Sequence, residues 1–229
     1  MTDHEKVVLL DGARTPIGSF GGVLKDVPAH ELGATSARAA LERSGIAADE
    51  IDEVVFGCIG QVGSDAYVAR RVALASGLPT SVPAHTVNRL CGSGLQSVWT
   101  AAMQLRWSDP GVCDVVLAGG NESMSRMPFY DFGARDGYRL GDRTLLDGTV
   151  MMLTDPFHGV HMGVTAENVA RAYDVSRRAQ DEFALVSQQR AASPEARAAF
   201  AEEITPVTTG GRTPREIVVD EHPKPGTTA

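Results

Sequence analysis

The sequence predicts an α/β fold in which a parallel sheet is covered by helices on both faces. Short apolar runs alternate with helix-like segments between residues 6 and 120. The runs are apolar without alternation, which is typical of strands buried on both faces. With 229 residues and 43% hydrophobic composition, the chain is long enough for one large domain or two small ones with a real core.

Breaker residues bound the first four predicted elements. KVVLLDGA (6–13) predicts a strand, because Gly-Ala-Arg-Thr-Pro ends the apolar run. Residues 28–44 predict a helix that is rich in alanine, has a proline near its start and is stopped by Gly45. EVVFGCIG (53–60) predicts a second strand, and AYVARRVALAS (66–76) predicts a second helix.

A third strand, AHTVN (84–88), leads into the best-marked helix, which begins after Cys91. Apolar residues spaced along one face of that helix predict its buried side, namely Leu95, Val98, Trp99, Ala102 and Leu105. Asp109, Pro110 and Gly111 end the helix, and CDVVLAGG (113–120) predicts the fourth strand.

The composition changes after the fourth strand, which predicts a second domain. Residues 126–160 are rich in Gly, Asp, Pro and aromatic residues. Helical patterns then resume in TAENVARAY (165–173) and SRRAQDEFALVSQQRAA (176–192), and a Ser-Pro pair starts one further helix. We predict an α/β domain over 1–123 and a helical, loop-rich domain over 124–229. The chain finishes without a closing element, so we expect this second domain to be incomplete.

Charge and composition narrow the class of protein. The net charge is −8 and no Lys/Arg stripe is present, so we expect no nucleic-acid partner. No stretch approaches the roughly 20 apolar residues of a membrane helix, and the amino-terminal apolar run is too short for a signal peptide. Three cysteines form an odd, sparse set, which indicates a reducing compartment, and we expect a cytoplasmic protein.

Cys91 is the candidate nucleophile. It stands where a strand becomes a helix, and Gly92 and Gly94 follow it. Backbone N–H groups at a helix start favour a thiolate, and glycines permit a tight turn and leave room for a substrate. A thiolate placed in this way attacks activated acyl groups, as at the strand–turn–helix elbow of hydrolases. The alternative is a small buried thiol that only packs at the helix start.

The other cysteines and the spaced histidines give weaker indications of a catalytic or metal site. Cys58 and Cys113 lie in apolar strands, where packing is their expected role. His158 and His161 have the spacing of a metal pair, but no third ligand is suitably placed, so we predict no metal site. The sequence contains neither a P-loop nor a Gly-x-Gly-x-x-Gly after a strand.

Five segments together resemble the thiolases, the acetyl-CoA C-acyltransferases. They are NRLCGSGLQS (88–97), ARTPIGSFGG (13–22), AHELGA (29–34), AGGNESMS (118–125) and HMGVTAENVA (161–170), and they occur in the order expected of thiolases. The resemblance covers essentially the whole chain. It implies a layered αβα sandwich of two similar halves with an inserted, loop-rich CoA-binding domain, of which this chain carries the first half and most of the loop domain.

The resemblance also implies a reaction and its participants. Cys91 would take the acyl group from one acyl-CoA in a ping-pong cycle. The cycle would condense two acetyl-CoA to acetoacetyl-CoA, or in reverse cleave a 3-ketoacyl-CoA with CoA. CoA thioesters would be substrates, with no permanently bound cofactor. The resemblance to thiolases also implies that the protein assembles as a homodimer or homotetramer.

Four further residues match the loop domain of thiolases. Leu153, His161 and Met162 match positions that line the pantetheine path and the acyl pocket. Lys224 falls where thiolases often carry a basic residue near the CoA phosphates. The alternatives are simple packing for Met162 and a solvated surface position for Lys224.

The chain lacks the motifs that thiolases carry in their second half. The Asn-Glu-Ala-Phe and Gly-His-Pro segments of thiolases are absent from the sequence, and so is the second reactive cysteine that thiolases carry in a Cys-x-Gly motif of their second half. They supply the base and the acid, so we expect a longer natural chain and little turnover from these 229 residues alone. Two alternatives stay open: a non-catalytic half-protein or CoA-binding subunit that needs a partner chain, and a condensing enzyme related to the ketoacyl synthases.

Overall fold

The computed structural model describes residues 6–228 and forms two compact units. The first contains residues 6–126 together with Ala201–Glu221, and the second contains Met127–Phe200 together with 222–228. In chain order the helices and strands are α1 (Ala29–Ser44), β1 (Glu53–Gly57), α2 (Val68–Ala75), β2 (Ala84–Val87), α3 (Ser93–Trp107), β3 (Val116–Gly120), β4 (Phe129–Tyr130), β5 (Leu146–Asp147), α4 (Gly148–Met152), α5 (Met162–Ala172), α6 (Arg177–Ala191), α7 (Pro194–Glu203), β6 (Val207–Thr208) and β7 (Glu216–Ile217).

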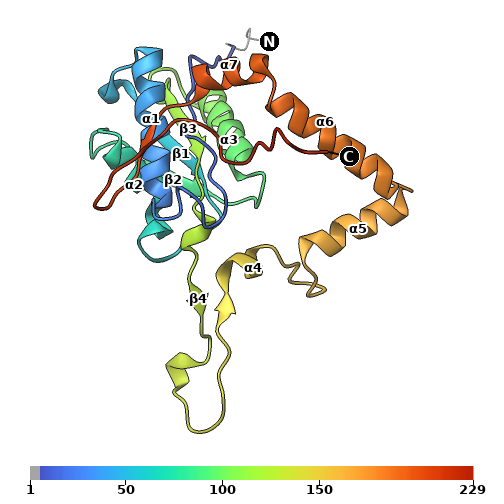
Figure 1. Ribbon diagram of the computed structural model, residues 1–229. Helices are drawn as coiled ribbons and strands as arrows, with labels where there is room; N and C mark the ends of the chain where they lie inside the picture. The colour runs from blue at the N-terminus through green and yellow to red at the C-terminus, as the bar shows by residue number, and fades with distance from the viewer. Residues whose placement is uncertain (1–5, 229) are drawn as a thin grey trace. The chain divides into compact units, whose positions relative to one another are not determined.

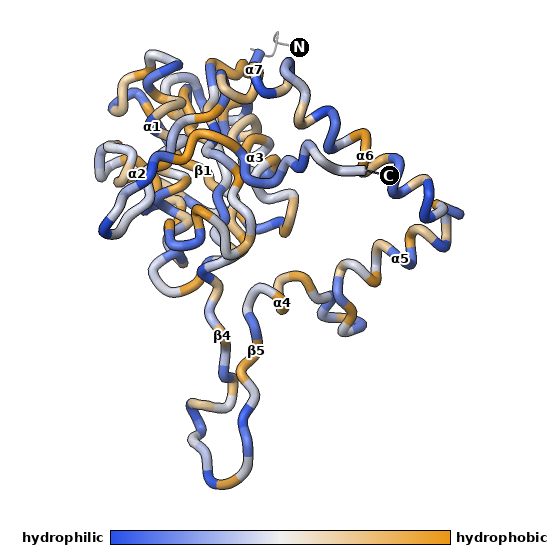
Figure 2. Tube along the Cα trace, viewed as in Figure 1, coloured by the Kyte–Doolittle hydropathy of each residue, from blue (hydrophilic) through white to orange (hydrophobic). Residues whose placement is uncertain are grey.

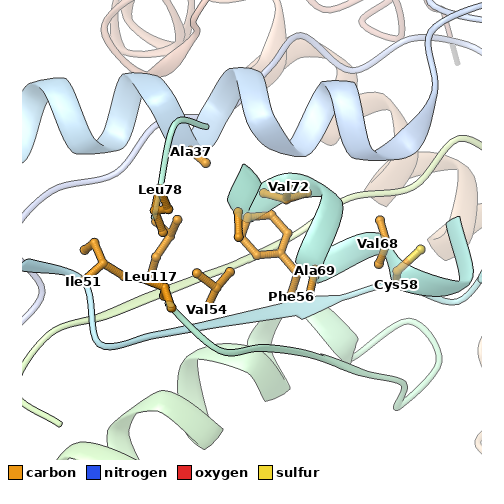
Figure 3. Close-up of a cluster of buried hydrophobic side chains, with 12 residues drawn as sticks. Ala37, Ile51, Val54, Phe56, Cys58, Val68, Ala69, Val72, Leu78 and Leu117 are labelled. Carbon is orange, nitrogen blue, oxygen red and sulfur yellow. The ribbon is translucent and has the colours of Figure 1, made fainter. Parts of the chain in front are cut away.

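A parallel sheet in the order β2-β1-β3 organises the first unit (Figure 1). In its register Val54 pairs with Ala84 on one side and with Leu117 on the other. Helices α1 and α2 cover one face of the sheet and α3 covers the other (Figures 1 and 3). The prediction of a parallel sheet between two helical layers is therefore confirmed.

The core of this unit lies between the sheet and the α1–α2 layer. Val54 and Phe56 of β1 point into it and are at most 2% exposed. Figure 3 shows the Phe56 ring directed toward Val72 of α2. Gly33 of α1 and Gly119 of β3 leave the room that this ring occupies, since a Cβ on Gly119 would lie 2.7 Å from the ring. Val55 points to the opposite face, under α3, and is also fully buried.

Two sequence-based predictions are wrong in this unit. Residues 6–13 form no strand, and Leu9 is 84% exposed, because no strand runs beside the segment to pair with it. The predicted buried face of α3 is not the buried one: Leu95 and Trp99 are 78% and 64% exposed, and Val98, Ala102 and Leu105 are only half-buried. Small residues face the sheet instead, and the buried residues of α3 are Ser93, Ser97 and Ala101.

The segment Ala201–Glu221 belongs to the first unit because it binds the amino-terminal segment. The Arg14 guanidinium makes two hydrogen bonds to the Asp220 carboxylate, at 2.7 and 3.0 Å, and one to Glu203 at 2.9 Å. Asp220 also accepts a hydrogen bond from the Ile17 backbone N–H. The predicted domains, 1–123 and 124–229, stay a prediction. The compact units differ from them by grouping this late segment with the amino-terminal part.

The second unit is built from a short hairpin and helices. Strands β4 and β5 pair in antiparallel fashion, and Asp147 caps α4 by accepting hydrogen bonds from Thr149 and Val150. Helix α6 is capped by the Ser176 hydroxyl, which accepts from the Ala179 N–H. Figure 2 shows apolar and polar residues interspersed along α5 and α6. No helix in residues 6–228 has the length and apolar character needed to cross a membrane.

Replacing Asp220 by asparagine should destabilise the first unit at neutral pH, by about 2 kcal/mol for a lost charge-assisted hydrogen bond. Hydrogen bonding from Arg14 lowers the pKa of Asp220 in the folded state. Its contribution is therefore present above the unfolded-state pKa and is lost as pH falls through the lower folded-state pKa. Urea unfolding at neutral and acid pH should show the difference between Asp220→Asn and the unaltered protein shrinking in acid.

Asp181→Asn is the matched control for this experiment. Asp181 pairs with Arg177 on the exposed surface of α6, where ion pairs contribute little. An Asp220 variant with the same stability as the Asp181 variant at neutral pH would contradict the stabilising role of the Arg14–Asp220 ion pair.

Candidate active site

The candidate nucleophile stands on the turn that joins β2 to α3. Because β1, β2 and β3 are parallel, their carboxyl ends share one edge of the sheet, and this turn begins at that edge. Cys91 is exposed, directly before Gly92, the N-cap residue of α3. The structure therefore presents the thiol to solvent at the strand–helix elbow that the sequence predicts.

The turn has a strained backbone. Leu90 adopts a left-handed conformation, with φ at 50°, which is uncommon for a leucine. The Asn88 side chain accepts a hydrogen bond from the Leu90 N–H at 3.0 Å. The Ser93 hydroxyl accepts from the Arg89 N–H at 2.8 Å and donates to the Leu90 carbonyl at 2.6 Å. These bonds hold the residues on either side of Cys91 in place.

The first turn of α3 rests on the backbone of the sheet. A Cβ on Gly57 of β1 would lie 2.3 Å from the carbonyl carbon of Ser93, and a Cβ on Gly120 of β3 would lie 3.0 Å from Gly94 Cα. One turn further on, the buried Ser97 hydroxyl lies 2.7 Å from the Gly119 carbonyl oxygen, to which it donates. Glycine in both strands thus lets the helix start approach the sheet closely and fixes the height of the elbow.

The other two thiols are held in their protonated form. Burial, followed by the charge of Glu122, raises the pKa of Cys58 to about 12. Burial also raises the pKa of Cys113, with Asp52 and Glu53 contributing. Both side chains are buried, as predicted for packing residues. Cys91 is the exposed cysteine of the three.

Glu122 organises the loop that follows β1. Its carboxylate accepts hydrogen bonds from the backbone N–H groups of Ile59 at 2.9 Å and Gly60 at 3.0 Å, and the Cys58 thiol lies 3.7 Å away. A carboxylate that accepts two backbone N–H groups fixes the conformation of a loop strongly. Glu122 therefore holds the loop at the carboxyl end of β1, the same sheet edge at which Cys91 stands.

Three of the residues matched to the loop domain lie together in the second unit. The Met162 N–H donates to the Leu153 carbonyl at 2.8 Å, and His161 forms a bridge with Thr154. His161 is the N-cap of α5, where its Nδ1 accepts from the Gly163 N–H at 3.0 Å. Their roles toward CoA stay a prediction.

Lys224 lies elsewhere in the second unit. Its backbone N–H donates to the side-chain amide oxygen of Gln188 on α6, at 2.7 Å. This contact fixes the main chain at Lys224 and leaves the side chain outside the interaction. The predicted role of Lys224 toward a phosphate therefore also stays a prediction.

Three of the histidines that the structure describes pair with carboxylates. His30 Nδ1 lies 2.9 Å from Asp65, which also binds Arg71, and His85 Nδ1 lies 2.8 Å from Glu53. His158 pairs with Asp155 at 2.6 Å. Within residues 6–228, no three or more His, Cys, Asp or Glu side chains gather in a way that could hold a metal ion.

Comparison with known proteins identifies the family. The family described as "Thiolase, N-terminal domain" matches residues 7–229. The chain belongs to the thiolase family. It is 48% identical over 208 residues to the beta-ketothiolase BktB of Cupriavidus necator, covering 90% of this chain and 52% of that protein. It is 46% identical over 208 residues to an acetyl-CoA acetyltransferase of the same organism, covering 90% of this chain and 51% of that protein.

A solved thiolase structure shares the fold. The crystal structure of the Bacillus anthracis acetyl-CoA acetyltransferase superposes with a TM-score of 0.92 at 39% identity, covering 96% of this chain and 56% of that one. The predicted thiolase-like fold is thereby confirmed. The chain spans about half the length of the curated relatives it matches.

Ser93, Glu122 and the left-handed Leu90 shape this candidate site but were not predicted from the sequence. The serine could have been suspected from its position three residues after Leu90, since hydroxyls commonly bond to nearby backbone groups. The backbone N–H partners of Glu122 are more than 60 residues away in sequence, at 63 and 62 positions, so no local signal indicates them.

Gly57→Ala should destabilise the protein by about 3 kcal/mol, the upper range for overpacking, because its new methyl group would overlap the α3 backbone rather than a movable side chain. Gly94→Ala is the matched control, since a Cβ there meets no atom within 4 Å. Urea unfolding of both variants provides the measurement. Equal stability of the two variants would show that the close approach of β1 and α3 does not constrain the structure.

Cys91 should be the first thiol that an alkylating reagent modifies. It is exposed, whereas burial raises the pKa of Cys58 and Cys113 and so suppresses their thiolates. Limiting iodoacetamide near neutral pH, followed by peptide mapping by mass spectrometry, measures the order. Earlier labelling of Cys58 or Cys113 in the folded protein would refute this expectation.

Proposed function

We propose that the protein is an acyltransferase of the thiolase type in which the Cys91 thiol carries the acyl group. The observation that carries the proposal is an exposed cysteine on a strained strand–helix turn, held by Ser93 and Asn88 at the carboxyl edge of a parallel sheet. Relatives named beta-ketothiolase and acetyl-CoA acetyltransferase support the same reaction class.

The reaction proceeds through a covalent thioester. The Cys91 thiolate attacks the carbonyl carbon of an acyl-CoA, the carbon–sulfur bond to CoA breaks, and CoA leaves as its thiol after taking a proton. In condensation, a second acetyl-CoA loses its α-proton to a base, and the resulting carbanion attacks the acyl group on Cys91. The bond to Sγ then breaks, which regenerates the thiolate and releases acetoacetyl-CoA. In cleavage, CoA and a 3-ketoacyl-CoA take the reverse path.

Residues of the second unit are proposed to bind the CoA thioester. Leu153, His161 and Met162 are joined by backbone contacts, which supports a shared role along the pantetheine arm and the acyl group. Lys224 would contact a CoA phosphate, and an ammonium group bound to a phosphate forms a charge-assisted hydrogen bond. The thioesters act as substrates, and the proposal includes no permanently bound cofactor.

The proposal also covers the oligomeric state of the protein and the cellular compartment in which it works. We place the protein in the cytoplasm, where a reducing environment keeps an exposed thiol such as Cys91 free. Its assembly is proposed to be a homodimer or homotetramer, on the basis of its likeness to the thiolases. The acyl-CoA substrates are the only small-molecule partners that the proposal requires.

Cys91→Ser should abolish cleavage of acetoacetyl-CoA by CoA in the protein expressed from its complete reading frame. Loss of a covalent nucleophile should lower kcat by at least about 10⁴-fold. Cys113→Ser, which removes a buried thiol, is the matched control and should keep the activity. Incubation with acetyl-CoA, followed by peptide mapping at acid pH, should place an acetyl group on the peptide that contains Cys91.

Two outcomes would overturn the proposed function. One is a Cys91→Ser variant that cleaves acetoacetyl-CoA as fast as the unaltered protein. The other is a protein that binds CoA but acquires no acetyl group on Cys91, which would favour a CoA-binding subunit instead.

A further inference from the structure

Ser93 makes hydrogen bonds that serve the turn rather than the helix it begins. A serine at a helix start usually occupies the N-cap and accepts a hydrogen bond from the second or third residue of the helix. Here Gly92 is the N-cap and provides no side-chain cap. The Ser93 hydroxyl instead bonds backward, accepting from the Arg89 N–H at 2.8 Å and donating to the Leu90 carbonyl at 2.6 Å.

These two bonds span the strained part of the elbow. The left-handed backbone of Leu90, with φ at 50°, costs of order 1–3 kcal/mol and persists only where neighbouring contacts hold it. The Ser93 N–H also donates to the Leu90 carbonyl, at 2.9 Å, so one residue binds the turn through its backbone and its side chain. Cys91 lies inside the loop that these bonds close.

Burial gives the Ser93 hydroxyl a fixed position. Ser93 is 4% exposed, and the backbone of Gly57 lies against its carbonyl group. A buried hydroxyl with two partners and a packed backbone has little freedom to move. The sheet therefore fixes Ser93, and Ser93 fixes the turn.

We propose that Ser93 is a positioning residue that sets the direction in which the Cys91 thiol points. The inference rests on the proposed function, in which Cys91 is the nucleophile. Ser93 is buried and acts through the turn, so it is not a catalytic residue. Without its hydroxyl, the Arg89 N–H loses its acceptor. Leu90 then keeps only its hydrogen bonds with Asn88 and the Ser93 N–H, which lets it relax toward right-handed conformations. The thiol would then leave its place at the start of α3.

The test compares the rates at which iodoacetamide modifies Cys91 in the purified protein across a range of pH near neutrality. Ser93→Ala should slow the reaction about tenfold, the effect of losing a hydrogen bond that holds the reactive conformation. Ser93→Thr keeps the hydroxyl and should restore the rate. Ser76→Ala is the control, because it removes another buried serine hydroxyl, bonded to Val72 of α2, and should leave the rate unchanged.

A Ser93→Ala variant that is folded and modified at the unaltered rate would overturn the proposal, as would a folded Ser93→Thr variant that is modified tenfold more slowly. If Ser93→Ala fails to fold, the Thr variant still decides, together with hydrogen exchange of the Arg89 amide in the unaltered protein. Slow exchange of the Arg89 amide supports its hydrogen bond to Ser93, and fast exchange would contradict that bond and the proposal.

Failure of this inference and failure of the proposed function give different results. If Cys91 is not the nucleophile, Cys91→Ser retains activity, whatever the alkylation rates are. If Ser93 does not position the thiol, Cys91→Ser is inactive while Ser93→Ala reacts and turns over like the unaltered protein.

Discussion

The first turn of α3 rests directly on the backbone of β1 and β3, and the geometry of the candidate site follows from that contact. Gly57 and Gly120 leave no side chain between the sheet and the helix start, so backbone meets backbone. Because these contacts involve main-chain atoms, small side-chain movements cannot relieve them. The height of Cys91 above the sheet edge is therefore set by the fold itself.

The two faces of the sheet have different roles: one packs the apolar core and the other positions the start of α3. The face toward α1 and α2 carries large side chains, with the Phe56 ring seated against Gly33, Gly119 and Val72. The face toward α3 meets small residues, among them the fully buried Ser97. The apolar core around Phe56 on one face holds the strands together, and close packing on the other face brings the helix start to the strand ends. The turn that carries Cys91 thus follows a strand of this sheet and leads into a helix that packs closely on it.

Much of this fold could be predicted from local sequence signals. Helix α1 begins and ends within one residue of its predicted bounds, because a proline and Gly45 mark its ends. The buried face of α3 could not be predicted, since the usual rule places large apolar residues inward. Here close approach to glycines in the sheet selects small residues, and Trp99 faces outward. The segment 6–13 has strand composition, but a strand also requires a neighbour with which to pair.

The sequence by itself determined the thiolase resemblance, the order of the elements from α1 to β3 and Cys91 as the candidate nucleophile, because these depend on residue types and short spacings. Only the tertiary structure decided which thiol is exposed, that Leu90 is left-handed, and that Ser93 and Glu122 hold the loops around the sheet edge. Burial and backbone conformation depend on atoms that distant segments bring together. A local pattern can name a reactive residue, but the packing of the whole unit determines where that residue points.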